Sequence, residues 1–246
     1  IAYQLRQKPG QETVIRAGTG IFYDSFNAVA SNGYNGVGFG GGARPSDIPF
    51  PFTQAQVDSL PNPSADPPYN APVFAADPHL KLPYSWQWNV AIEQALGSKQ
   101  TLTVNYVGSA GRRLLIQKEY DPSLLGNENF DTGNGLRIAD NRSLSNYDAL
   151  QVRFQRRLSH GLQALIAYTW SHSLDDVSSN SVVGEQYYAN SDFDIRHNFQ
   201  ATLTEDLPGR FQSRPLNAAL SKWSLDLRFT ARSGLPVDIL GGQGID

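Results

Sequence analysis

The sequence of 246 residues contains no cysteine and no methionine, and it carries little net charge. Without cysteine, a disulfide scaffold, a thiolate metal site and a cysteine nucleophile are excluded. The formal charge of −3 gives no overall attraction to nucleic acid, so we expect no nucleic-acid partner. A complete translation product begins with Met, so its absence indicates a processed chain or an excerpt of a longer one.

Long hydrophobic runs are missing as well. No stretch approaches the roughly 20 apolar residues that a membrane-spanning helix needs, and no positively charged and then apolar leader opens the chain. Hydrophobic residues nevertheless make up 40% of the sequence. A strand that spans a bilayer has only one apolar face, so average hydropathy hides it and a membrane location stays open.

The sequence shows instead a regular alternation of apolar and polar residues, which is the period of a β-strand with two different faces. In residues 86–93 the even positions are aromatic or aliphatic and the odd positions are polar or small. A turn cluster at 96–99 separates this run from a second alternating run at 101–106, which predicts a hairpin. Comparable pairs of runs are 1–7 with 13–23, 150–158 with 162–170, and 193–203 with 223–229. We therefore expect about eight strands in four hairpins.

The connections between these runs differ in length in a regular way. Turns within hairpins are short, with the one after Leu207 somewhat longer, whereas long connections lie near residues 25–83, 115–146 and 175–191. Such loops are uncommon in a compact soluble domain, but outer-membrane barrels have short periplasmic turns and long external loops. We therefore predict an all-β fold, an antiparallel up-and-down transmembrane β-barrel segment that occupies residues 1–246. A soluble β-sandwich is the alternative, although it would have shorter strands and no such rhythm of loops.

The two parities of the strands predict which side chains meet lipid and which line the lumen. Amphipathic rings next to the long loops predict an aromatic girdle at the membrane interface. The girdle residues are Tyr23, Trp86, Trp88, Tyr106, Tyr168, Trp170 and Phe193. The lumen-facing residues are Arg16, Gln87, Asn89, Glu93, Asn105, Gln151, Arg153, Arg196, Asn198, Asp226 and Arg228. Arg outnumbers acid in this set, so a lumen that selects by charge would favour anionic groups, while each single residue is also compatible with an ordinary hydrated wall.

No catalytic or metal-binding constellation stands out, and we expect neither enzymatic activity nor a cofactor. None of the four histidines has metal-ligand spacing to another. The neighbours Ser171-His172-Ser173 and Asp175-Asp176 have the residue types of a triad, but adjacent strand residues point to opposite faces. The acidic segment 127–131 does not satisfy a Ca²⁺ loop, and the glycines of 36–42 lack the ending of a phosphate-binding loop.

Several segments carry a recognisable pattern in a fixed order along the chain. They are residues 13–24 (TVIRAGTGIFYD), 105–111 (NYVGSAG), 145–151 (SNYDALQ), 156–157 (RR), 167–176 (AYTWSHSLDD), 192–199 (DFDIRHNF), 206–208 (DLP), and the strand at Trp223 that leads into 233–236 (SGLP). Together they resemble the barrel of Oar-like TonB-dependent receptors. The resemblance implies a barrel of about 22 strands around an N-terminal plug, in the outer membrane of a Gram-negative-type bacterium, energised by the TonB complex.

The chain departs from that family in length. It is too short for the whole barrel, shows no TonB box or plug, and does not end on an apolar-aromatic strand. We therefore expect a piece of a barrel wall, with a self-closed barrel of about eight strands as the alternative. The resemblance implies active uptake of a bulky nutrient, with outer-membrane lipid and, through a region outside this chain, the TonB complex as partners. The alternatives are a structural or adhesive outer-membrane barrel and a soluble β-sheet binding module.

Overall fold

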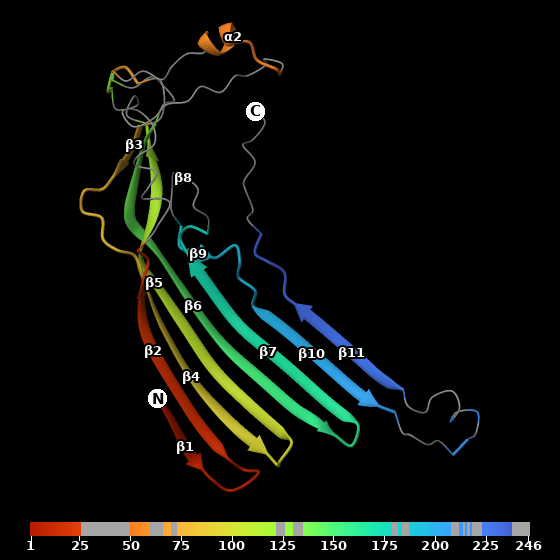
Figure 1. Cartoon of the computed structure of the whole chain (residues 1–246). Coiled ribbons are helices and arrows are strands. Elements are labelled where there is room, and N and C mark those ends of the chain that lie inside the picture. Colours follow the sequence, from red (N-terminus) through yellow and green to blue (C-terminus); the bar gives the residue numbers. More distant parts are fainter. Residues whose placement is uncertain are drawn as a thin grey trace, which may run out of the picture.

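The alternating segments form one β-sheet of 11 strands in the computed structural model (Figure 1). The structure describes residues 1–25, 50–59, 66–69, 73–121, 126–129, 135–178, 182–183, 187–207, 212–213, 215, 217 and 223–237. Eight strands follow one another across the sheet, each antiparallel to its neighbour. In sheet order they are β1 (Ala2–Arg6), β2 (Thr13–Tyr23), β4 (Tyr84–Leu96), β5 (Gln100–Tyr120), β6 (Leu136–Ser159), β7 (Leu162–Asp175), β10 (His197–Asp206) and β11 (Ser224–Arg232). This up-and-down order confirms the predicted fold class.

The sheet is open. Figure 1 shows tilted strands side by side in a curved sheet, with β1 at one edge and β11 at the other. No pairing joins these two edges within the described part of the chain. The sheet therefore has the form of a sector of a barrel wall. A soluble sandwich would need a second sheet, whereas all described strands belong to one sheet.

The register gives the sheet two different faces. One row that crosses all strands from β2 to β11 is polar or small: Arg16, Ala91, Asn105, Gln151, Thr169, Asn198 and Arg232. The row one residue away along β2, on the other face, is apolar: Ile15, Ile92, Val104, Val152, Tyr168, Phe199 and Ala231. We call the side of the first row the polar face and the side of the second row the apolar face. Because strand side chains alternate, every second residue returns to the same face.

Large apolar side chains are not buried in a core. The most buried hydrophobic residues are almost all alanines, such as Ala139 and Ala149, which are 0% and 2% exposed. Trp170, Leu227 and Phe229, in contrast, are all about half exposed on the apolar face. A contiguous apolar surface of this extent needs an apolar surrounding, because water would oppose it. Among the described residues, no helix is long and apolar enough to span a bilayer.

At one end of the sheet, short turns join β1 to β2, β4 to β5 and β6 to β7, and the longer segment 207–223 joins β10 to β11. The connections between hairpins lie at the other end (Figure 1). The tightest turn joins β6 to β7, where Ser159 pairs with Leu162 and the two residues between them, His160 and Gly161, have φ of 53° and 80°. Positive φ at both central residues is the type I′ geometry that matches the twist of a hairpin. The short turns thus fix the register of neighbouring strands.

The predicted loop at 115–146 is largely paired strand in the structure. β5 continues to Tyr120 and β6 begins at Leu136, so the two strands are much longer than the roughly 10 residues of one membrane crossing. Register shifts between Gly111 and Ile116 let the ladder continue past irregular positions. β3 (Val73–Ala76) and β8 (Val182–Val183) add parallel pairs to β6 and β5. These four segments form what we call the β5–β6 extension.

The other long connections contain short elements. α2 (Gln54–Asp58) begins with a capping box between Thr53 and Gln56, a signal that alternation alone does not reveal. β9 (Ala189–Asn190) pairs with the end of β7. Most of the predicted loop at 25–83 before β3, including the glycines of 36–42, lies outside the described residues.

Candidate functional site

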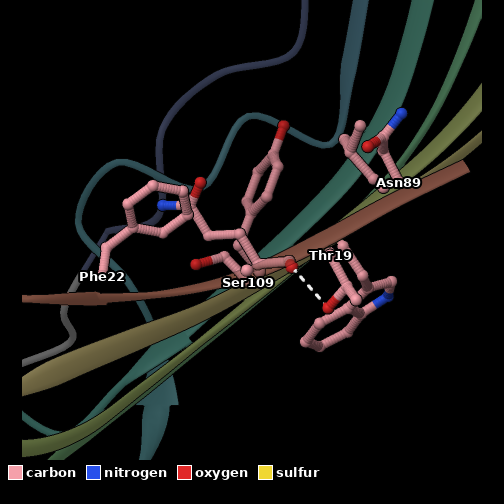
Figure 2. A pocket seen from close by; sticks show the side chains of 11 residues that line it. Thr19, Phe22, Asn89 and Ser109 are labelled. Carbon is pink, nitrogen blue, oxygen red and sulfur yellow. Dashed lines mark hydrogen bonds between the residues drawn. The ribbon is translucent and has the colours of Figure 1, made fainter. Parts of the chain in front are cut away.

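A pocket of about 590 Å³ lies on the polar face, where β2, β4, β5 and β6 run side by side (Figure 2). It lies in the half of the sheet toward the long connections, since β4 enters the sheet there at Tyr84. Most of its lining residues come from neighbouring rows of the polar face, and Thr19, Trp88 and Gly108, from one row of the apolar face, complete the lining. The polar-face rows are Gly20, Gln87, Ser109 and Tyr147, then Gly18, Asn89 and Val107, with Phe22 beyond them on β2.

Two glycines make the floor of the pocket. A β-carbon added at Gly20 would lie 3.2 Å from Cε2 of Phe22, and one added at Gly18 would lie 2.8 Å from Oδ1 of Asn89. The Phe22 ring and the Asn89 amide therefore occupy space that a side chain on the floor would need. Figure 2 shows Phe22, Ser109 and Asn89 on the same side of the strands. The alternating glycines thus hold one aromatic and one amide group over a flat backbone surface.

None of the described residues that line the pocket is charged. Ser109 Oγ is 2.9 Å from Ser85 Oγ, within hydrogen-bond distance. The side chains of Gln87, Asn89 and Tyr147 form no hydrogen bond with any other residue that the structure describes. Two amides and a phenol are therefore available to a ligand as donors and acceptors.

All the predicted lumen residues except Arg196 belong to rows of the polar face. The charged members lie toward the short turns. Arg16 pairs with Glu93 at 3.1 Å, and Thr204 Oγ1 donates to Asp226 Oδ1 at 2.6 Å. Across β2, β4, β5 and β6, the polar face thus has a neutral half with the pocket and a charged half. That this face lines a lumen stays a prediction.

All the predicted girdle residues except Phe193 lie on the apolar face. Three of their polar ends have partners on the same face: Trp86 Nε1 donates to Thr19 Oγ1 at 2.7 Å, the Tyr106 hydroxyl donates to Asp148 Oδ1 at 2.6 Å, and the Tyr168 hydroxyl bonds to a histidine described below. Such bonds matter at a membrane interface, because a polar group without a partner is costly in an apolar surrounding. That these rings form an interfacial girdle stays a prediction.

Two residues near the start of β10 differ from simple alternation. Phe193 lies in the turn before the strand, where it is 69% exposed, because β10 begins only at His197. His197, a polar ring at an apolar position, bonds through Nδ1 to the Tyr168 hydroxyl at 2.8 Å. The histidine is therefore a satisfied member of the apolar face.

The two-faced strands, the short turns at one end and the exposed apolar side together agree with the result of a comparison with known families. A family model described as "Outer membrane beta barrel domain" matches residues 1–245. The chain belongs to the outer membrane beta-barrel domain family. This barrel domain is located in the outer membrane, with its strands in the bilayer.

Among solved structures, the barrel domain is similar to the outer membrane transporter YddB from Escherichia coli. The two share 11% identity with a TM-score of 0.49, over 89% of this chain and 31% of that chain. The barrel domain therefore spans less than a third of the length of that transporter. No curated protein matches the sequence.

Arg196 is the one predicted lumen residue that lies outside the described strands, and its position toward a lumen stays a prediction. It lies just before β10, with Nε 2.6 Å from Asp194 Oδ2 and Nη2 3.0 Å from His172 Nε2. Burial of the carboxylate raises the pKa of Asp194, but the Ser173 N–H and the Arg196 guanidinium together outweigh it. The pKa of Asp194 therefore lies below its ordinary 3.8. Arg196 anchors this turn to the end of β7.

The serine, histidine and aspartate neighbours near the end of β7 do not assemble as a triad. His172 contacts Asp194 and Arg196, while Asp176 accepts a hydrogen bond from Ser143 Oγ at 2.6 Å. Among the described residues of the barrel domain, no group of three or more His, Asp or Glu side chains could hold a metal ion. Residues 130 and 131 of the acidic segment lie outside the described part.

Sequence reasoning missed the pocket of the barrel domain. A signal was present, because Phe22 and Tyr147 are aromatic residues on a parity that is mostly polar or small. Gly18 and Gly20 share that parity on β2, so the two glycines and Phe22 follow one another on one face. An aromatic ring on the polar parity beside glycines indicates a contact surface rather than a lipid anchor.

Proposed function

We propose that the barrel domain is part of the wall of a TonB-dependent outer-membrane receptor that takes up a bulky nutrient by active transport. The observation that supports this most directly is the polar face, where a neutral pocket toward the long connections gives way to charged rows toward the short turns. A transport passage needs a wall that presents polar groups to a solute on one side and apolar groups to lipid on the other. No bond of the nutrient is broken, so we propose no enzymatic role.

The open edges of the sheet support a larger barrel. Within a bilayer, unpaired backbone N–H and C=O groups cost several kcal/mol each, so β1 and β11 need further strands beside them. The sequence resemblance supplies the candidate architecture, a barrel of about 22 strands around a plug. In this proposal, energy from the TonB complex reaches the receptor through a region outside this chain.

The experiment compares three strains of the native host: wild type, a deletion of this gene, and a deletion of TonB. Mass spectrometry follows which compounds each strain removes from a complex medium. We expect at least one bulky compound that wild-type cells deplete and both deletion strains leave. Identical depletion by wild type and by the strain without this gene would contradict the proposal. If depletion needs this gene but not TonB, the protein would instead be a passive channel, and active transport would be rejected.

A structural or adhesive barrel is the second candidate, and the β5–β6 extension favours it. The extension carries cation–aromatic contacts, with Lys118 Nζ 5.5 Å from the Tyr120 ring and the Arg137 guanidinium 5.7 Å from the Phe74 ring. These contacts join residues within the extension, whose strands are longer than one membrane crossing and can meet another surface beyond the bilayer. In the same strains, loss of surface attachment without any change in depletion would select this function.

A further inference from the structure

We propose that the polar-face pocket binds a neutral sugar ring of a glycan. The inference rests on the proposed function, in which the polar face lines the route of the ligand. It adds a binding site and a substrate class to that function. The pocket volume of about 590 Å³ lies within the range of small-molecule sites.

The kinds of groups in the pocket match the chemistry of a sugar. A sugar ring has faces of polarised C–H bonds and an edge of hydroxyls, each both donor and acceptor. The Phe22 ring is 58% exposed beside the glycine floor, and its negative π-face attracts such C–H bonds. The amides of Gln87 and Asn89 each offer N–H donors and a C=O acceptor, which suits hydroxyl partners.

Other ligand classes fit the pocket less well. An anionic ligand needs a cation, but the pocket lining contains no charged residue in the part of the chain that the structure describes, and the nearby Arg16 is paired with Glu93 at 3.1 Å. A purely apolar ligand would cover the amides of Gln87 and Asn89 and leave them without hydrogen-bond partners. A neutral polyhydroxylated ligand satisfies both the ring and the amides.

The two glycines of the pocket floor, Gly18 and Gly20, explain why the pocket lies over this part of β2. At Gly18 and Gly20, a β-carbon would meet Asn89 and Phe22, so any other residue would displace the groups that are to hold the sugar. Glycine lets the backbone and a flat ligand approach closely. The position toward the long connections would let a ligand reach the pocket before it reaches the charged rows.

The test measures glycan binding by the full-length protein, purified in detergent from its native host. A glycan array with neutral and anionic members identifies ligands, and titration calorimetry with the best neutral oligosaccharide gives the Kd. Phe22→Leu and Gln87→Ala should each weaken binding about tenfold, as the loss of a ring contact or of a hydrogen bond predicts. Phe22→Trp should keep the affinity within about threefold, because it keeps an aromatic face.

Gln155→Ala is the matched control. Gln155 lies on the same face of β6, in the row of Thr101 and Leu165 toward the short turns, outside the pocket. The Gln155→Ala variant should bind the neutral oligosaccharide with the same affinity as the wild type. Heat-modifiable mobility in SDS gels verifies that each variant assembles. Binding of anionic glycans only, no binding of neutral glycans, or equal weakening by Gln87→Ala and Gln155→Ala would each overturn the inference.

The outcomes also separate this inference from the proposed function. Neutral-glycan binding that depends on Phe22 and Gln87, in a protein whose deletion changes no uptake, would support the site and reject transport. Uptake that depends on this gene and on TonB, without any binding of neutral glycans, would support transport and reject the site.

Discussion

Val90 and Ile92 are 48% and 47% exposed on the apolar face, whereas Ala91, between them and on the polar face, is 7% exposed. Large hydrophobic residues thus point outward on the apolar face, whereas small residues are covered on both faces, since Ala110 and Ala164 of the apolar face are 6% and 5% exposed. In water this arrangement would be unfavourable for the apolar face. The exposed hydrophobic residues agree with lipid on the apolar side of the sheet, while water on the polar side stays a prediction.

The largest expected effect comes from a charge on the apolar face near the middle of a strand. Ile166 lies on that face of β7, paired with Phe154 and Ala201. Ile166→Arg should destabilise the assembled barrel by about 2–4 kcal/mol, since an arginine at the bilayer midplane loses its hydration. The fraction of heat-modifiable protein in outer membranes of the native host measures the loss.

The matched control is the preceding residue. Leu165 lies on the polar face, between Gln155 and Thr202 in its row, so Leu165→Arg places the same charge at the same depth against polar neighbours. We expect assembly close to that of the wild type. Equal loss of assembly in both variants would show that the two faces do not differ in their surroundings.

A smaller effect on the free energy of unfolding is expected when a glycine on either face is replaced by alanine. At Gly108 on the apolar face, an added β-carbon would lie 2.2 Å from Cε2 of Trp88. That ring also packs against Trp86, with 5.2 Å between the ring centroids, so it cannot move without a cost. Gly108→Ala should therefore lower the free energy of unfolding by about 1–3 kcal/mol. Urea unfolding in lipid vesicles, followed by tryptophan fluorescence, measures it.

Gly18→Ala is the counterpart on the polar face. Its β-carbon would meet only Asn89 there, and the closest atom is Oδ1 at the end of a side chain that can rotate. We expect a loss below about 1 kcal/mol in the same urea titration. If Gly18→Ala proves as destabilising as Gly108→Ala, tight packing is not a special property of the apolar face.

The faces of the sheet were predictable because alternation is a local signal. Each strand shows its own parity, and short turns such as Ser159–Leu162 fix the register of the next strand. The β5–β6 extension was not predictable in this way. The φ of 56° at Arg113 and the register shifts after Gly111 interrupt the alternation, and the parallel partners of the extension come from distant parts of the chain.

The pocket could not be predicted from any single strand, because its lining depends on the register between strands. Gly20, Gln87, Ser109 and Tyr147 come from four strands and meet only when the register is known. At Phe193, alternation predicted a strand, but the structure has a turn before β10. The Asp194 carboxylate turns back to accept the Ser173 N–H at 2.8 Å, which holds a turn where a strand was expected.

The smallest expected effect lies where the apolar face ends, at Asp194. Because its folded pKa lies below the ordinary 3.8, its bonds contribute full stability above that pH and lose it as the pH falls through the folded value. Hydrogen exchange of the Ser173 amide, which donates to Asp194 Oδ1, should therefore accelerate as the pH falls below about 4, after correction for the intrinsic rate. The Val104 amide, in the middle of β5, should keep its protection. Asp194→Asn should remove the pH dependence at Ser173, and a Val104 amide that loses protection at the same pH would show that the whole sheet opens rather than this turn.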